Sequence, residues 1–121
     1  MTDFEPATLE QIDAADLVRI RVGDHEPRQI WVVVVDGALH AQSWRGRPGH
    51  GWTNALLTAG SGALLYGDHE VEVAADAVSD EATRDAIYAA ISAKYSDTAA
   101  EYVPPFAEPA SRATALRFRP A

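Results

Sequence analysis

The run Arg28 to Val35, which ends at Asp36-Gly37, constrains the fold of this chain more than any other segment. Its apolar part, Ile-Trp-Val-Val-Val-Val, has no polar interruption, and such a run is typical of a strand that is buried on both faces. Asp-Gly between two strand-like segments is the strongest short signal for a tight hairpin turn. We therefore expect Ala38 to Ser43 to return antiparallel to the first strand.

Four other segments have the pattern of strands. Leu17 to Val22 alternates in a way that predicts a half-buried strand. Ala63 to Tyr66 and His69 to Ala75 predict a second hairpin around Gly67-Asp68, and Thr114 to Arg119 predicts the last strand.

Three segments predict helices. Thr8 to Ala15 is a short candidate with Thr8 as its N-cap, and Trp52 to Ala59 is a second, apolar one. A longer helix is expected to begin after an N-cap at Ser79 or Asp80 and to run to about Lys94.

Ser96 to Pro109 contains two adjacent prolines, and we expect it to be irregular. The chain then has six strands, two hairpins and little sign of parallel crossovers. This order favours a mainly β fold with helices (α+β), in which six antiparallel strands form a small barrel and one longer helix packs on it. A chain of 121 residues is expected to form a single domain, residues 1–121.

Composition excludes several classes of function. The chain has no cysteine, so it has no disulfide, thiol nucleophile or thiolate metal site. His25, His40 and His69 lack the spacing of metal ligands, and we expect no metal site. A net charge of −8 opposes binding to nucleic acid or to an anionic membrane. The apolar run is too short to span a membrane and the N-terminus has no signal pattern, so we expect a cytoplasmic protein.

The loop Ser43 to Asn54 is rich in glycine, arginine and tryptophan. Glycines let backbone N–H groups approach a ligand closely, and the guanidinium groups of Arg45 and Arg47 can clamp a phosphate or carboxylate. The indole of Trp52 can stack on a flat ring, and a core anchor is its alternative role. His50 is the best-placed general acid or base, and a loop histidine without catalytic duty is its alternative. The loop predicts a site for an anionic, partly aromatic ligand.

Short motifs in a fixed order carry a resemblance to a known group of proteins. They are Ile30-Trp31-Val32-Val33 with Asp36-Gly37, Ser43-x-Arg45-Gly46, Gly51-Trp52 with Ala55-Leu56, Ala93-Lys94-Tyr95, and Thr114-x-Leu116-Arg117-Phe118. In this order the chain resembles the split β-barrel of flavin-binding proteins, the pyridoxamine-phosphate-oxidase-like and deazaflavin-dependent group. Within that group it is most similar to a small bacterial family of unknown function.

This resemblance implies a cofactor that lies against the loop after the third strand and against the next helix. It carries the cofactor contacts of the group onto Ser43, Arg45, Gly46 and Trp52, and Arg47 and His50 join them by position.

Deazaflavin-dependent relatives often have the pattern Trp-x-x-Asn-Leu in that helix. Here Ala55 stands at the asparagine position, and Asn54 is one residue away, about 100° around a helix. The chain thus departs from the deazaflavin pattern at this point, and Asn54 is included among the candidate cofactor-binding residues.

Residues and resemblance together favour a homodimer that binds FMN or a deazaflavin, or a similar anionic aromatic ligand. If the chain is an oxidoreductase, hydride transfer is the expected reaction, because the cofactor would carry the chemistry. A two-fold dimer is expected because the strand Ile30 to Val35 is more apolar than one small barrel can cover. Two alternatives need no cofactor: a cyclase or isomerase that uses His50 or a tyrosine in the barrel cavity, and a non-enzymatic small-molecule-binding or assembly module.

Overall fold

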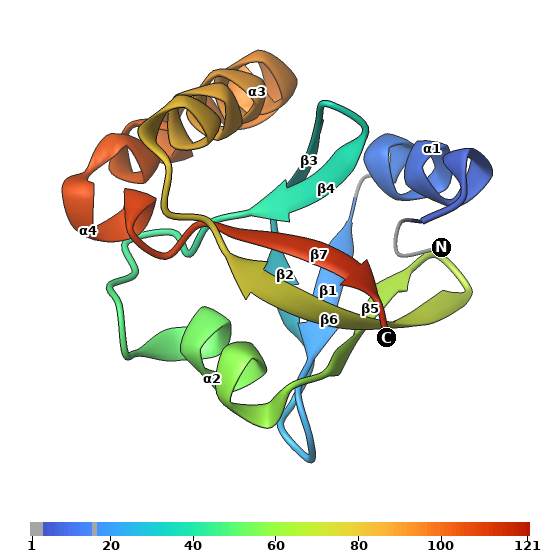
Figure 1. Cartoon of the computed structure of the whole chain (residues 1–121). Helices are drawn as coiled ribbons and strands as arrows, with labels where there is room; N and C mark the ends of the chain where they lie inside the picture. Colours follow the sequence, from blue (N-terminus) through green and yellow to red (C-terminus); the bar gives the residue numbers. More distant parts are fainter. Residues whose placement is uncertain (1–3, 16) are drawn as a thin grey trace.

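The computed structural model describes residues 4–15 and 17–121, and its centre is one antiparallel sheet of seven strands (Figure 1). The strands pair in the order β2-β1-β5-β6-β7-β4-β3. Their bounds are β1 Val18–Arg21, β2 Arg28–Ile30, β3 Val32–Val35, β4 Ala38–Ala41, β5 Gly62–Tyr66, β6 His69–Ala77 and β7 Leu116–Pro120. The α+β class with an antiparallel barrel is confirmed.

The two strands at the ends of this order, β2 and β3, are separated in the chain by Trp31 alone. Ile30 pairs with Val18 on β1, whereas Val32 pairs with Ala41 on β4. The chain itself therefore joins the two edges of the sheet, which makes the barrel nearly closed and leaves little free edge.

The predicted single strand Arg28 to Val35 is thus two strands, and the count is seven rather than six. The break arises because the two halves of one apolar run pair with different strands, a choice that depends on residues far away in the sequence. The Asp36-Gly37 turn is confirmed, with φ angles of 51° and 76°, the positive values that a tight hairpin of this type requires.

Both faces of β3 are buried, as predicted. Val32 packs into the barrel interior together with residues such as Leu39 and Phe118. Val33 points to the other side and packs with Ile87 and other residues of the helical layer. The same chain therefore covers the strand whose exposure motivated the expected dimer, and the dimer itself stays a prediction.

The helical segments lie around the barrel. They are α1 Pro6–Ala14, α2 Gly51–Ala59, α3 Glu81–Ala99, the 3-10 turns η1 Ala100–Tyr102 and η2 Pro104–Ala107, and α4 Pro109–Arg112. Figure 1 shows α3 over the β3–β4 hairpin, with α1 beside the hairpin and α2 at the opposite end of the barrel. No helix in the described ranges is long and apolar enough to cross a bilayer.

Two helix predictions need correction. The first helix begins at Pro6 with Glu5 as its N-cap and no side-chain cap, so the cap at Thr8 is wrong. The long helix has the predicted cap, since Asp80 accepts from the backbone N of Thr83 at 2.9 Å. It continues five residues beyond Lys94, to Ala99, and short helices follow where an irregular segment was expected.

Contacts with the barrel explain why α3 continues. Lys94 Nζ donates to the backbone O of Val32 at 2.8 Å, and Tyr95 stacks on Trp31 with ring centroids 4.0 Å apart. Burial raises the pKa of Tyr95 to about 12, so its hydroxyl stays protonated and donates to the same carbonyl at 3.3 Å. These contacts place the end of α3 and the turns after it at the side of the barrel where β2 ends and β3 begins.

Candidate cavity between the barrel and the C-terminal turns

A cavity of about 510 Å³ lies between β2, the loop after β4 and the segment that follows α3. Its size is within the usual range for small-molecule sites. It is lined by Arg28, Gln29, Ile30, Trp31, Gln42, Ser43, Trp44, Trp52, Ala99, Tyr102 and Phe106. The cavity therefore collects residues from four separate parts of the chain.

Aromatic side chains dominate the lining, and all three tryptophans of the chain belong to it. Trp31 is held by stacking on Tyr95 and Phe106, with centroids 4.0 and 5.3 Å apart. Trp44 and Tyr102 are more exposed, at 44% and 47%, and contact each other edge to face with a centroid distance of 5.7 Å. The indole N–H of Trp44 also donates to the backbone O of Tyr102 at 3.0 Å. The cavity thus has fixed aromatic walls and an accessible aromatic pair.

Trp52 has the core role that was the alternative in the sequence, and it also reaches the cavity. It is 8% exposed and lies nearly parallel to Phe118, with ring centroids 6.2 Å apart. A second, smaller cavity of about 210 Å³ shares Trp52 and Arg28 with the first one. His25 and Glu26 in the β1–β2 loop line this smaller cavity.

Buried polar groups connect the loop after β4 to the C-terminal segment. Ser43 donates its backbone N–H to Thr114 Oγ1 at 2.8 Å and accepts at its carbonyl from the Ser111 hydroxyl at 2.6 Å. The backbone N–H of Gly46 donates to the same carbonyl at 3.0 Å. A Cβ atom at Gly46 would collide with the Ser43 side chain, so this glycine permits the close turn.

Arg28 lines the cavity, and Arg45 and Arg47 lie in the loop after β4; none of the three has a carboxylate partner in the described residues. Four other arginines of the chain form ion pairs at 2.5–3.2 Å, and these are Arg21, Arg84, Arg112 and Arg119. In a chain of net charge −8 carboxylates are abundant, so the lack of a carboxylate partner leaves these three guanidinium groups available to other anions.

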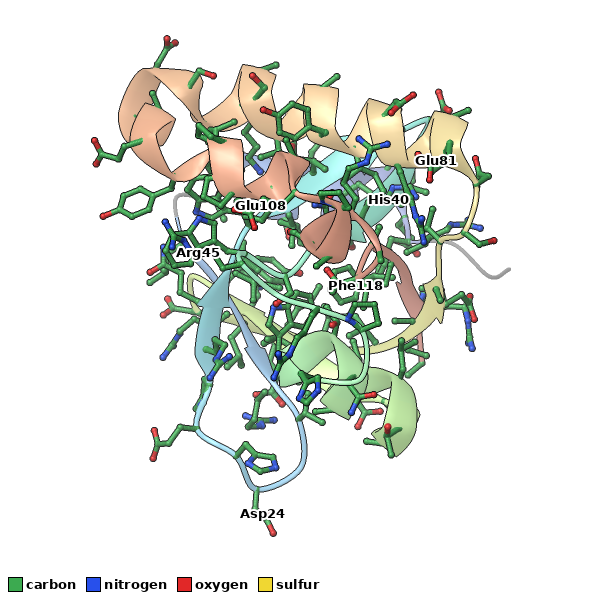
Figure 2. The ribbon with its side chains drawn as sticks, turned by 90° about the vertical axis from the view of Figure 1, so that its left-hand side faces the viewer. Asp24, His40, Arg45, Glu81, Glu108 and Phe118 are labelled. Atoms are coloured by element: carbon green, nitrogen blue, oxygen red, sulfur yellow. The ribbon has the colours of Figure 1, made fainter. Side chains whose placement is uncertain are left out.

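Arg45 does not line the cavity, but its side chain contacts Trp44, which does. Its guanidinium lies 4.9 Å from the centroid of the Trp44 ring, within range of a cation–π contact. Its backbone has a φ of 53°, a left-handed conformation that side chains other than glycine rarely adopt. Figure 2 places Arg45 at the side of the molecule between the helical layer and the β1–β2 strands.

The predicted site residues divide into two groups. Ser43 and Trp52 line the cavity. Arg45, Gly46, Arg47, His50 and Asn54 belong to the loop and to the first turns of α2, but they are not among the lining residues. Ligand contacts for this second group stay predictions.

Sequence reasoning missed most of the lining. Arg28 was assigned to a strand, and its place on an edge beside the loop depends on the break at Trp31. Tyr102 and Phe106 fall in the segment expected to be irregular. The density of aromatic residues close to the two prolines was the one signal that could have indicated a packed role.

The lining has little capacity for acid–base chemistry by itself. Of its residues, Arg28 and Tyr102 alone carry ionisable side chains, and no carboxylate or histidine is among them. No cluster of three or more His, Cys, Asp or Glu side chains suited to a metal ion occurs in the described ranges. Among the lining residues, few side chains can therefore transfer a proton.

Solved structures with low sequence identity share this fold. A conserved hypothetical protein of Mycobacterium tuberculosis is 13% identical with a TM-score of 0.65, and the match covers 99% of this chain and 81% of that one. A candidate pyridoxamine 5′-phosphate oxidase of Listeria innocua is 14% identical with a TM-score of 0.55, covering 95% and 90%. An FAD-binding protein of Mesorhizobium loti is 16% identical with a TM-score of 0.55, covering 99% and 90%. At these identities the likeness concerns the fold.

Sequence comparison identifies the family. No curated protein matches at a significant level. The model of a family described as uncharacterised proteins conserved in bacteria (DUF2255) matches residues 8–118, which is nearly the whole chain. This match and the oxidase-like fold confirm the resemblance drawn from the short motifs. The chain belongs to this bacterial family.

Proposed function

We propose that this protein binds a flavin or a deazaflavin, or a closely similar anionic aromatic ligand, in the cavity of about 510 Å³. The observation that carries the proposal is the combination of aromatic walls with Arg28, whose guanidinium group lacks a carboxylate partner in the described residues. The ring would lie among the tryptophans, and the anionic group would meet Arg28 and the loop arginines.

The energetics favour an anion at Arg28. A hydrogen bond to a charged group contributes about 1.5–3 kcal/mol, and an arginine fork can form two of them to one phosphate or carboxylate. Arg28 is exposed and has no side-chain partner in the described part of the chain, so binding breaks no ion pair there. Arg45 and Arg47 would add further contacts if the loop moves toward the ligand.

The side-chain amide of Gln42 also fits a cofactor of this class. The side-chain oxygen of Gln42 is buried beside the cavity and has no hydrogen-bond partner in the described structure. Flavin and deazaflavin rings carry both donors and acceptors on one edge. Two solved proteins with this fold, described as a candidate pyridoxamine 5′-phosphate oxidase and an FAD-binding protein, also support a cofactor of this class.

If the protein is an enzyme, we expect an oxidoreductase. A bound flavin or deazaflavin supplies hydride transfer, which needs few ionisable protein groups. The chain would bind the ring, orient it and exclude water from one side of it. This division of labour agrees with a lining that has Arg28 and Tyr102 as its ionisable residues.

The same lining supports one further candidate, a non-enzymatic protein that holds such a ligand without reacting with it. A cofactor-free cyclase or isomerase receives less support. His50 is exposed and is not part of the lining, so among the described residues Tyr102 is the one tyrosine or histidine that lines the cavity, and the barrel interior is filled by side chains such as Leu64 and Phe118.

Purified protein provides the first test. A bound flavin gives a visible absorption band, and mass spectrometry of the supernatant after denaturation identifies the ligand. If the protein is purified without ligand, calorimetric titration with FMN and with 5-deaza-FMN should show binding of one molecule per chain. Absence of binding to both compounds would refute the proposal.

A further inference from the structure

Only the NH₂ group of the Gln42 side-chain amide forms hydrogen bonds with the described residues. The residue is 1% exposed and lies in the wall of the cavity. Its Nε2 donates to the backbone O of Phe106 at 2.7 Å and to Ser111 Oγ at 3.1 Å. Its Oε1 is buried and has no hydrogen-bond partner in the described structure. A buried acceptor without a donor destabilises a protein, because water solvated it in the unfolded chain.

The amide cannot turn over to remove this defect. A turn would place Oε1 against the carbonyl of Phe106, so that two acceptors would face each other. The Ser111 hydroxyl cannot serve as the donor either, because its proton goes to the backbone O of Ser43 at 2.6 Å. The orientation of the Gln42 amide is therefore fixed by its neighbours, and Oε1 stays a buried acceptor without a partner in the described structure.

We propose that Gln42 selects the ligand by accepting a hydrogen bond from an N–H group on the edge of its ring. This inference rests on the proposed function and adds a requirement to it. The isoalloxazine ring and its deaza analogue both carry such a group, N3–H, between two carbonyls. A ring that presses against this wall and displaces the atoms covering Oε1 brings its donor to an acceptor that has no other partner.

Selection follows from the cost of an unpaired group. A ligand with an N–H at that edge satisfies Oε1, whereas a ring with an alkyl group or an acceptor there leaves it unpaired. Sites that are built to hydrogen-bond a donor discriminate strongly against analogues that lack it. The ligand class is therefore a ring with an imide or amide N–H, which includes flavins and deazaflavins.

The test compares ligands that differ at N3 alone. FMN and 5-deaza-FMN are titrated into the full chain beside their 3-methyl derivatives, which lack the N3 proton. We expect the methylated compound to bind at least about tenfold more weakly than its parent. A labelled ligand gives an independent reading, because the N3–H of ¹⁵N-labelled FMN should exchange with solvent much more slowly when bound than when free.

Two variants assign the effect to Gln42. Gln42→Met keeps the size of the side chain but removes its acceptor together with the Nε2 donor, and it should bind parent and methylated ligand equally. Thr114→Val is the matched control, because Thr114 Oγ1 belongs to the same network, accepting from Ser43 N at 2.8 Å and donating to Ser111 O at 2.6 Å, but does not line the cavity. This control should keep the preference for the parent compound.

The outcomes separate the inference from the function on which it rests. Equal binding of FMN and 3-methyl-FMN to the wild-type chain would overturn the role of Gln42 and leave flavin binding intact. A preference that persists in Gln42→Met would show steric exclusion of the methyl group and would also overturn it. If Gln42→Met does not fold, N3–H exchange as fast in the complex as in free FMN is the overturning result. Failure of all four ligands to bind would remove the proposed function and this inference together.

Discussion

Arg28 is the one arginine among the lining residues in the described structure, and it lines both cavities on this side of the molecule. Arg45 and Arg47 are not among the lining residues, and Arg45 lies against the Trp44 ring. We therefore predict that Arg28 makes the main anion contact and that Arg45 makes a supporting one beside the aromatic pair at the cavity.

Arg28→Ala should weaken binding of FMN by about 1.5–3 kcal/mol, because a charge-assisted hydrogen bond to the anionic group is lost. The stability of the fold should hardly change, since Arg28 is exposed and has no side-chain partner in the described ranges. Arg19→Ala is the matched control: Arg19 is also exposed and unpaired there, but it is not among the lining residues of either cavity. Calorimetry that finds equal losses in the two variants would contradict this assignment.

Arg45→Ala tests the supporting contact. If Arg45 holds the anionic group, binding should weaken by roughly 1.5–3 kcal/mol, and Arg45→Lys should restore only part of the loss, because an ammonium cannot form the two-pronged contact. Urea denaturation should show little change in either variant, since the residue lies in an exposed loop. Unchanged affinity in Arg45→Ala would leave Arg28 as the anion contact.

At the scale of elements, the sequence predicted those features that depend on neighbours along the chain. The Asp36-Gly37 hairpin, the strands around Gly67 and the cap at Asp80 follow from local turn and cap chemistry. The break at Trp31 did not follow, because β2 and β3 are separated by their pairing with different strands. The lining of the cavity could not be predicted for the same reason, because it forms only where the break at Trp31 lies next to the end of α3.

The layer between β4 and α3 contains a buried titratable residue, His40. It is 4% exposed, and its Nδ1 lies 3.0 Å from the backbone O of Ala38. Burial is the main cause that lowers its pKa, and the positive charge of Arg117, its partner across the strands, lowers it further. The hydrogen bond to Ala38 and the charges of Asp36 and Asp80 act in the opposite direction.

The lowered pKa of His40 determines the direction in which the stability of the fold changes with pH. The unfolded chain takes up a proton at His40 near pH 6.5, while the folded chain resists it, so stability should fall as the pH drops below about 6.5. Thermal unfolding measured at pH 7.5 and 5.5 should show this loss in the wild type and a smaller loss in His40→Gln. Equal losses in both proteins would mean that His40 does not control this range.

At the scale of the whole molecule, the open question is whether one chain completes the site. The helix α3 covers the apolar strand, so that strand gives no reason for a second copy. Trp44 and Tyr102 remain, exposed at 44% and 47% beside the cavity. Large exposed aromatic residues of this kind are enriched at the centres of protein interfaces.

We predict a two-fold homodimer that covers this aromatic pair. Light scattering at micromolar concentration should give twice the mass of the chain, and Trp44→Ser should shift the equilibrium toward the monomer. Leu57→Ser is the control, because Leu57 is 41% exposed on α2 and is not part of the lining. A wild-type protein that scatters as a monomer would contradict the dimer and require all ligand contacts to come from one chain.

The central claim is that a flavin-type ring enters the cavity that all three tryptophans line. Tryptophan fluorescence of the whole protein therefore responds to a ring that enters this cavity, and the decisive measurement is a titration with FMN or 5-deaza-FMN. The account predicts saturable quenching of most of the tryptophan emission at one ligand per chain for at least one of the two compounds. Emission that stays constant, apart from the linear absorption effect of free ligand, would contradict the account.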